Sequence, residues 1–187
     1  MKKNIHTLLI LIFFAISCTS KNETEALNYK YEAALKNQDL VQAEYYVDKM
    51  IAIHKNDPKY LKLKIPLLLN RCAKDQTLKV LDQTLAVDQK NINLLLLKAV
   101  LLPKGDPQSQ TLHKVIKQIE ENLTQNSGSR TQNISYLVNT YKLLGYNEND
   151  IREKLKSLHL NQADKNTVDE FITIPIEVVT QSITHCT

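Results

Sequence analysis

The sequence predicts an all-helical protein, and three observations carry that prediction. The chain of 187 residues has only 3 Gly, and no glycine-rich string of the kind that cradles phosphate in nucleotide-binding enzymes. Apolar residues fall at spacings of three and four along most of the chain, as amphipathic helices require. Between residues 26 and 121 they also recur at a fixed offset of 34 residues, which indicates a repeat of paired helices. These observations predict an α-solenoid of antiparallel helical hairpins.

The first residues are typical of a secreted chain. Residues 1–3 are Met-Lys-Lys, and residues 8–16 are apolar but too short to span a bilayer as a stable helix. Residues 15–18, Ala-Ile-Ser-Cys, follow directly and resemble the bacterial lipobox. The resemblance implies that residues 1–17 are a signal peptide and that Cys18 is acylated, for example with palmitate.

Two or three acyl chains anchor a protein firmly, since each buried CH₂ contributes about 0.8 kcal/mol. The mature chain would therefore lie on a membrane without crossing it. Residues 18–25 are polar and predict a short tether. In lipoproteins an Asp after the acylated Cys usually retains the protein at the inner membrane, and position 19 here is Thr19. The expected location is therefore the outer membrane of a bacterial envelope, at its periplasmic face or at the cell surface.

The charge balance argues against a nucleic-acid partner. Removing Lys2 and Lys3 with the signal peptide leaves 24 − 2 = 22 basic residues against 20 acidic ones, which is a net charge of +2. Acidic and basic residues are evenly mixed along the chain, and they form no basic stripe that could follow a phosphate backbone. We therefore expect no nucleic-acid binding.

Two further cysteines remain in a compartment that permits disulfides. The sequence leaves two possibilities open: Cys72 and Cys186 form a disulfide, or they are separate thiols with Cys72 buried as a small apolar residue. Neither belongs to a C-x-x-C motif, and the five His residues are far apart in sequence. We expect no metal site and no cofactor.

The 34-residue offset links five columns of apolar or small residues, which predicts that the same helix faces are buried in successive hairpins. The columns are Leu27, Leu61 and Leu95; Tyr31, Ile65 and Ala99; Ala34, Leu68 and Leu102; Val47, Leu81 and Val115; and Ile51, Leu85 and Ile119.

Aspartates mark the predicted helix starts. Asp57 and Asp106 each precede a proline, which combines an N-cap acceptor with a residue suited to the first helical turn. Asp39 and Asp75 precede apolar stripes and are predicted caps as well. Pro66 lies inside the predicted helix over 58–71, where it removes one backbone donor and predicts a kink.

Residues 39–51, DLVQAEYYVDKMI, with the Asp-Pro at 57–58, resemble the second helix and closing Asp-Pro of the tetratricopeptide repeat family, whose unit is a 34-residue helical hairpin. The resemblance covers roughly residues 24–125. It implies a right-handed solenoid with three such hairpins over 26–125, followed by a divergent hairpin and a capping segment over 126–187.

The chain departs from the family pattern in two columns. The helix-packing alanine is Ala43 in the first unit but Thr77 and Thr111 in the next two. A column that is normally a buried leucine contains lysines, whose stems can cover apolar surface while the ammonium reaches water. These are Lys30, Lys64 and Lys98.

Beyond the repeats, residues 130–144 predict a helix that ends at Gly145. Asn149 or Asp150 would cap the following helix, and residues 167–170 have a capping-box pattern. Residues 174–179 combine strand-forming residues with a proline, and a capping helix is the preferred interpretation because a solenoid must cover its last apolar face.

No catalytic constellation emerges from the sequence, so we expect a protein that is not an enzyme. His185 and Cys186 are adjacent, and neighbouring side chains on a helix or strand do not face each other. The acidic pairs at 120–121 and 169–170 have no partner cluster at helical spacing. An envelope hydrolase is thus the less favoured alternative.

The expected function is binding of a protein or peptide, because stacked hairpins expose a face made by the first helix of each unit. The sequence predicts an interaction module, such as an assembly or adaptor lipoprotein; the alternative is an immunity lipoprotein that neutralises a toxin. The predicted polar binding residues are Asn28, Glu32, Lys36, Lys59, Lys62, Asn70, Asn93 and Lys104, accompanied by Leu35, Leu69 and Leu96.

Overall fold

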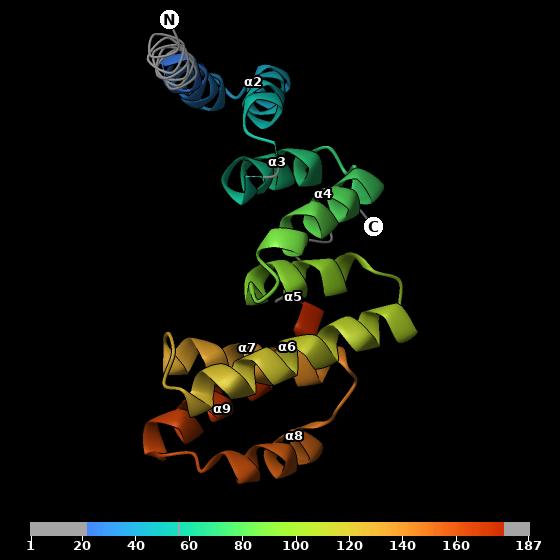
Figure 1. The fold of residues 1–187 in the computed structure, drawn as a ribbon. Helices are drawn as coiled ribbons and strands as arrows, with labels where there is room; N and C mark the ends of the chain where they lie inside the picture. Colours follow the sequence, from blue (N-terminus) through green and yellow to red (C-terminus); the bar gives the residue numbers. More distant parts are fainter. Residues whose placement is uncertain (1–21, 56, 178–187) are drawn as a thin grey trace, which may run out of the picture. The chain divides into compact units, whose positions relative to one another are not determined.

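A computed structural model describes residues 22–55 and 57–177, and within these ranges the chain is helical without any strand (Figure 1). The predicted all-α class is confirmed. The chain divides into two compact units, Met1–Val87 and Asp88–Thr187, which we call the N-terminal and C-terminal units. The division falls inside the segment 26–125. No helix in the described ranges is both long enough and apolar enough to cross a membrane.

The N-terminal unit consists of two helical hairpins. A helix over 22–36 pairs with α2 (Leu40–Ile53), and α3 (Pro58–Asn70) pairs with α4 (Lys74–Val87). Helix α3 also packs against α2, so neighbours in sequence are neighbours in space. A buried cluster joins the first three helices, and its members are Tyr31, Ala34, Ala43, Val47, Met50, Tyr60 and Leu67.

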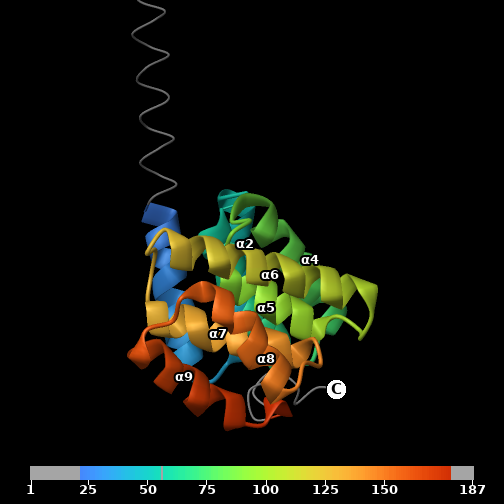
Figure 2. The same cartoon turned by 90° about the horizontal axis from the view of Figure 1, so that it is seen from below.

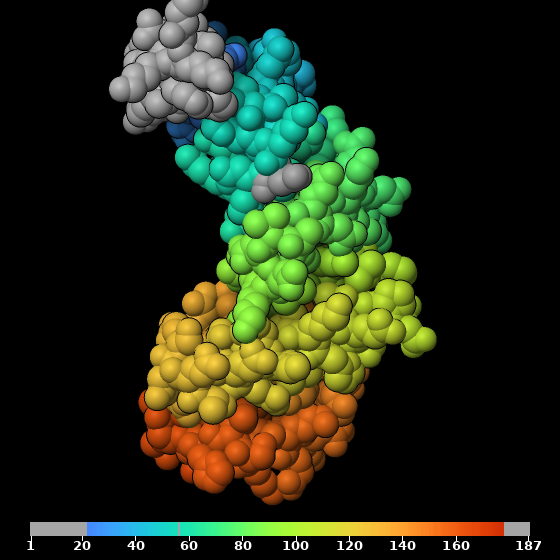
Figure 3. Space-filling view, viewed as in Figure 1, coloured from blue at the N-terminus to red at the C-terminus, as the bar shows by residue number. Residues whose placement is uncertain are grey.

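The C-terminal unit starts with a third hairpin and then departs from simple pairing. Its elements are α5 (Ile92–Leu101), α6 (Asp106–Thr124), α7 (Arg130–Leu143), α8 (Glu148–Leu155), the 3₁₀ turn η1 (Lys156–Leu158) and α9 (Gln162–Thr173). Helix α7 packs mainly between α6 and α9, as Figure 2 shows, and touches α8 less. In Figure 3 the long helix α6 forms much of the visible surface of this unit.

The five columns of the 34-residue offset lie in the interior. Every member is buried or half-buried, which confirms that the same faces of successive hairpins turn inward. Leu61 and Leu81 are buried as expected, while Leu85 at the end of α4 is half-buried.

The departures from the repeat pattern have local physical explanations. Thr77 and Thr111 are buried at the alanine position, and each hydroxyl donates to the backbone oxygen four residues earlier at 2.9 Å. The polar atom is therefore satisfied inside its own helix. Lys64 is only partly buried, and its ammonium pairs with Asp48 at 2.5 Å and Glu44 at 3.9 Å. The lysine stem covers apolar surface while its charge is neutralised at the edge.

Two of the four aspartate caps are confirmed and two are wrong. Asp39 accepts from the backbone N–H of Gln42, and Asp57 accepts from that of Lys59. Helix α4 begins one residue before Asp75, so this carboxylate lies in the first turn, where it still favours the positive helix end. Asp106 is likewise the first residue of α6, because Gly105 adopts a φ of 140° and takes the cap position.

Later helix starts also differ from the prediction. Asn147 caps α8 in place of Asn149 or Asp150. The capping box of α9 is Asn161 with Asp164, so residues 167–170 lie inside that helix. Helix α7 and the positive φ of Gly145 agree with the prediction.

Three other features refine the prediction. The first helix already includes residues 22–25 of the predicted tether, and residues 18–21 lie outside the described residues. Pro66 lies in an unbroken α3 with its ring exposed. Ile174 is the C-cap of α9, Ile176 and Glu177 are helical, and residues 178 and 179 lie outside the described residues.

Cys72 is exposed and disulfide-bonded, so the alternative of a buried free thiol is wrong. It follows α3 with a φ of 59°, in a turn where its N–H donates to the oxygen of Leu69 at 3.0 Å. Its predicted partner Cys186 lies outside the described residues, as does Cys18, and the pairing with Cys186 therefore stays a prediction.

Candidate functional site

A groove in the N-terminal unit lies between the helix over 22–36, the end of α2 and the start of α3. Its volume is about 460 Å³. Three of the predicted binding residues, Asn28, Glu32 and Lys59, line it together. We call this cavity the N-terminal groove, and its other lining residues are Thr24, Glu25, Tyr29, His54 and Tyr60.

One wall of the groove is a single face of the first helix. Glu25, Asn28, Tyr29 and Glu32 are spaced by three, four and seven residues, so their side chains lie on the same side. The opposite side of this helix contributes Tyr31 to the buried cluster. Packing of the hydrophobic face therefore fixes which polar residues face the groove.

His54 connects the three helices around the groove. It is the C-cap of α2, with its backbone N–H donating to the oxygen of Met50 at 2.9 Å. Its ring stacks on Tyr60 with centroids 4.9 Å apart, and its Nε2 lies 2.7 Å from the hydroxyl of Thr24. These contacts hold the imidazole in one orientation at the base of the groove.

The second wall is set by the first turn of α3. The Asp57 carboxylate accepts the backbone N–H of Lys59 at 2.8 Å, and Pro58 fits the first helical position. Lys59 is exposed, and its ammonium lies 5.1 Å from the centroid of the Tyr60 ring. Stacking and a cation–π contact therefore involve the same buried tyrosine.

The groove combines opposite charges with an exposed aromatic ring. Glu25 and Glu32 supply carboxylates, Lys59 supplies an ammonium, and Asn28 both donates and accepts hydrogen bonds. Tyr29 is 77% exposed, an unusual position for a large ring. This chemistry fits recognition of a peptide, in which the ring provides apolar contact and the polar groups provide direction.

The other predicted binding residues do not line this groove. Lys36 and Asn70 are exposed near helix ends, Lys62 is half-buried on α3, and Asn93 accepts a hydrogen bond from the hydroxyl of Tyr136 in α7. Leu35, Leu69 and Leu96 are half-buried.

Lys104 lies in the C-terminal unit, where it lines a cavity of about 720 Å³ together with Lys142. The ammonium of Lys142 donates to the backbone oxygens of Phe171 and Ile174 at the end of α9. Burial lowers the pKa of Lys142, while the nearby Glu148 opposes that shift. Lys142 thus joins α7 to the C-terminal end of α9.

Sequence reasoning missed several residues that line the N-terminal groove. Glu25 and Tyr29 belong to the same helical face as Asn28 and Glu32, so the three-and-four spacing could have found them. Thr24, His54 and Tyr60 come together only when the first three helices are packed, and no pattern in the sequence indicates that meeting.

Within residues 22–55 and 57–177, no three His, Cys, Asp or Glu side chains lie close enough together to hold a metal ion. No protein-family model, curated protein or solved structure matches the chain. The class of protein is therefore defined by the fold alone, as an all-α protein of helices packed in consecutive pairs.

Proposed function

We propose that this protein is a lipid-anchored interaction module of the bacterial cell envelope, an assembly or adaptor lipoprotein that binds a protein or peptide in the N-terminal groove. Support for the anchor comes from the sequence, in which an apolar segment over 8–16 leads directly to Cys18. The anchor would place the groove beside the outer membrane.

The observation that carries the binding proposal is the position of Tyr29. Its ring is 77% exposed although a large aromatic side chain gains free energy from burial. The ring shares the groove with Glu32 and Lys59, one charge of each sign. A peptide that covers Tyr29 and pairs with one or both charged groups would bury apolar area and gain polar contacts at the same time.

A photo-crosslinking experiment tests the binding proposal in cells that produce the lipidated chain. Tyr29 is replaced by a benzoyl-phenylalanine, and the control carries the same group in place of Tyr45, which is exposed on α2 outside the groove. We expect a discrete crosslinked adduct from position 29 that position 45 does not give. Adding Lys59→Glu should weaken that adduct.

The binding proposal is rejected if both positions give the same adducts, or if position 29 gives none. Circular dichroism of each variant separates a lost contact from a lost fold, since both tyrosines are exposed and surface substitutions usually change stability by only about 0.5 kcal/mol.

The anchor has its own test. Cys18→Ser removes the thiol that would be acylated, so the chain should move from the membrane fraction to the soluble fraction. Cys72→Ser is the matched control, because it also removes a cysteine but should leave the chain on the membrane. Retention of the Cys18→Ser variant on membranes at high salt would refute lipidation at this residue.

A further inference from the structure

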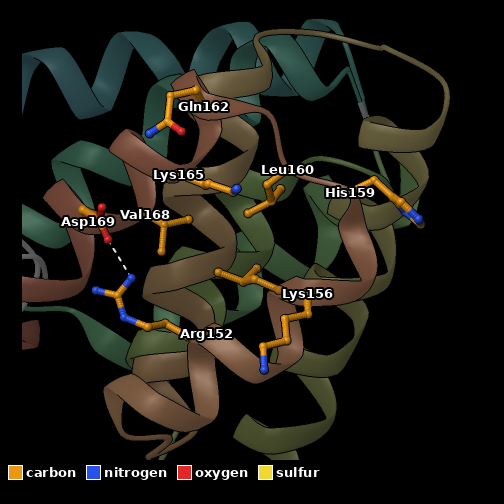
Figure 4. Close-up of a pocket in the computed structure, with 9 residues that line it drawn as sticks. Arg152, Lys156, His159, Leu160, Gln162, Lys165, Val168 and Asp169 are labelled. Carbon is orange, nitrogen blue, oxygen red and sulfur yellow. Dashed lines mark hydrogen bonds and ion pairs between the residues drawn. The ribbon is translucent and has the colours of Figure 1, made fainter.

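A second cavity, in the C-terminal unit, lies between α8 and α9 and has a volume of about 510 Å³ (Figure 4). We call it the α8–α9 groove. None of its lining residues was singled out as a binding residue from the sequence. They are Arg152, Leu155, Lys156, His159, Leu160, Gln162, Lys165, Val168 and Asp169.

The charges around this groove are unbalanced. Arg152, Lys156 and Lys165 are cationic, and Asp169 is the one carboxylate in its lining. Asp169 is already paired with Arg152 at 2.6 Å, and Lys156 of η1 is paired with Glu153 of α8. The ammonium of Lys165 makes no ion pair with the described residues. Lys165 therefore presents a positive charge that no carboxylate of the described residues neutralises.

The floor of the groove is apolar. Leu155 of α8 and Val168 of α9 line the groove and are almost fully buried, while Leu160 is half-buried. Figure 4 shows the Lys165 side chain directed toward Leu160, whereas the ring of His159 points away from them. An apolar floor thus lies beneath a rim on which Lys165 and Arg152 come from α9 and α8, respectively.

The two helices that form the groove are held in place before any ligand arrives. His159 adopts a left-handed conformation with a φ of 48°, which reverses the chain after η1. The N-terminal turn of α9 is then fixed by the capping box of Asn161 and Asp164, and Arg130 of α7 binds the Asp164 carboxylate. A preformed groove lowers the ordering cost of binding.

We propose that the α8–α9 groove binds a short acidic segment of a partner protein, with an apolar side chain over Leu160 and a carboxylate at Lys165. Charge complementarity favours an acidic ligand. The groove is a hollow of about 510 Å³ between two helices, which favours a peptide side chain that can enter it over a flat lipid surface. This site is separate from the N-terminal groove, and its test does not depend on the proposed function.

The probe is a fluorescent peptide with the sequence acetyl-Glu-Leu-Leu-Glu-amide, titrated with the purified full-length chain at low ionic strength and followed by anisotropy. We expect saturable binding that weakens as salt is added, since exposed charges are screened. Lys165→Glu should weaken binding about fivefold or more, because an exposed pair contributes up to about 1 kcal/mol and reversal adds repulsion. Lys165→Arg should preserve it.

Lys114→Glu is the matched control, since Lys114 is an exposed lysine of α6 in the same unit and lies outside the groove. It should change the dissociation constant less than twofold, and circular dichroism should show that both charge-reversal variants remain folded. The proposal is overturned if the peptide does not bind saturably, if a Gln-Leu-Leu-Gln peptide binds equally well, or if Lys114→Glu has the same effect as Lys165→Glu. Binding to anionic vesicles in place of the peptide would also overturn it.

Discussion

The two units use the same kind of element but bury different chemistry. Among its described residues, the N-terminal unit buries two polar side chains, Thr77 and Thr84, and both hydroxyls donate to a backbone oxygen of their own helix. The C-terminal unit buries more polar residues, and four of them lie on α7. The buried polar residues of this unit are Thr111, Asn133, Ser135, Asn139, Thr140, Asp164 and Thr167.

This difference follows the order in which the helices pack. In the N-terminal unit each helix packs on its neighbour in sequence, and the apolar columns at a 34-residue offset lie on the faces that meet. In the C-terminal unit α9 packs on α7, and directional contacts join the two: Arg130 of α7 binds Asp164, and Lys142 binds the end of α9. Polar contacts specify an arrangement that hydrophobic periodicity alone leaves open.

The largest effect should come from the apolar core of the N-terminal unit. Leu81 has no exposed surface, so Leu81→Ala should lower the free energy of unfolding by about 2 to 5 kcal/mol through lost transfer energy and a cavity. Urea denaturation, monitored by circular dichroism, measures this change in the free energy of unfolding. Val87→Ala on the same helix is the control, because Val87 is exposed and should cost no more than about 0.5 kcal/mol. Equal stability of the two variants would show that the faces are assigned wrongly.

The next effect should come from the polar contact between α7 and α9. The Asp164 side chain is 5% exposed and accepts Arg130 Nε on both oxygens, at 3.0 and 2.9 Å. Asp164→Asn keeps the shape but removes the charge, so the loss should be about 2 to 3 kcal/mol, as for hydrogen bonds to charged groups. Asp169→Asn, on the exposed face of the same helix, is the comparison in a urea titration and should be nearly neutral. A tolerated Asp164→Asn would contradict the role given to polar contacts.

Alkaline pH should weaken the C-terminal unit through Tyr141. Burial, followed by Glu120 and Tyr146, raises the pKa of Tyr141 from 10.0 to about 12. The folded state therefore favours the neutral phenol, so this stabilisation is complete below pH 10 and disappears as the pH rises to about 12. At about 1.4 kcal/mol per pKa unit, the contribution is on the order of 3 kcal/mol.

The measurement is the free energy of unfolding at several pH values between 8 and 12, for the wild type and Tyr141→Phe. The difference between the two proteins should change with pH in that upper range, because phenylalanine has no proton to lose. Parallel pH profiles would show that the Tyr141 phenol is not the group responsible.

The smallest expected change is an increase in stability, whereas the changes above lower it. The Oδ1 atom of Asn139 is buried with no hydrogen-bond partner among the described residues, which is unfavourable. Asn139→Ala removes that atom and raises helix propensity, so it should stabilise the protein by about 0.5 to 1 kcal/mol. Asn133→Ala is a matched control on the same helix, where the amide donates to the oxygen of Ser127 at 3.0 Å, and it should destabilise. Thermal unfolding distinguishes them, and a destabilised Asn139→Ala would show that its oxygen is satisfied.

Most of the helical pairing could be predicted from the sequence, because burial of Leu61, Leu81 and Val115 follows from one offset. Helix starts were harder to predict where several candidate N-cap residues occur within one turn. Asn147, Asn149 and Asp150 all have suitable side chains, and only the path of the backbone decides that Asn147 accepts from the N–H of Asp150. Periodicity carries no information on that path.

The candidate site was predictable only in part, for a related reason. Asn28 and Glu32 follow from the face of one helix, and Lys59 from the first turn of the first helix in the next hairpin. His54 and Tyr60 meet because α2 ends where α3 begins, so their stacking depends on the angle between two helices. A pattern of residue types does not define that angle.

The threonines at the alanine position have a consequence for how this chain can change over time. A hydroxyl that closes on its own backbone, as in Thr77 and Thr111, turns mainly the methyl group outward toward the adjoining helix. At such positions alanine and threonine both present a methyl group to the neighbouring helix, so either residue can pack there even though threonine is polar. A lineage can therefore drift between them while conserving its architecture, so that resemblance in sequence fades sooner than resemblance in packing.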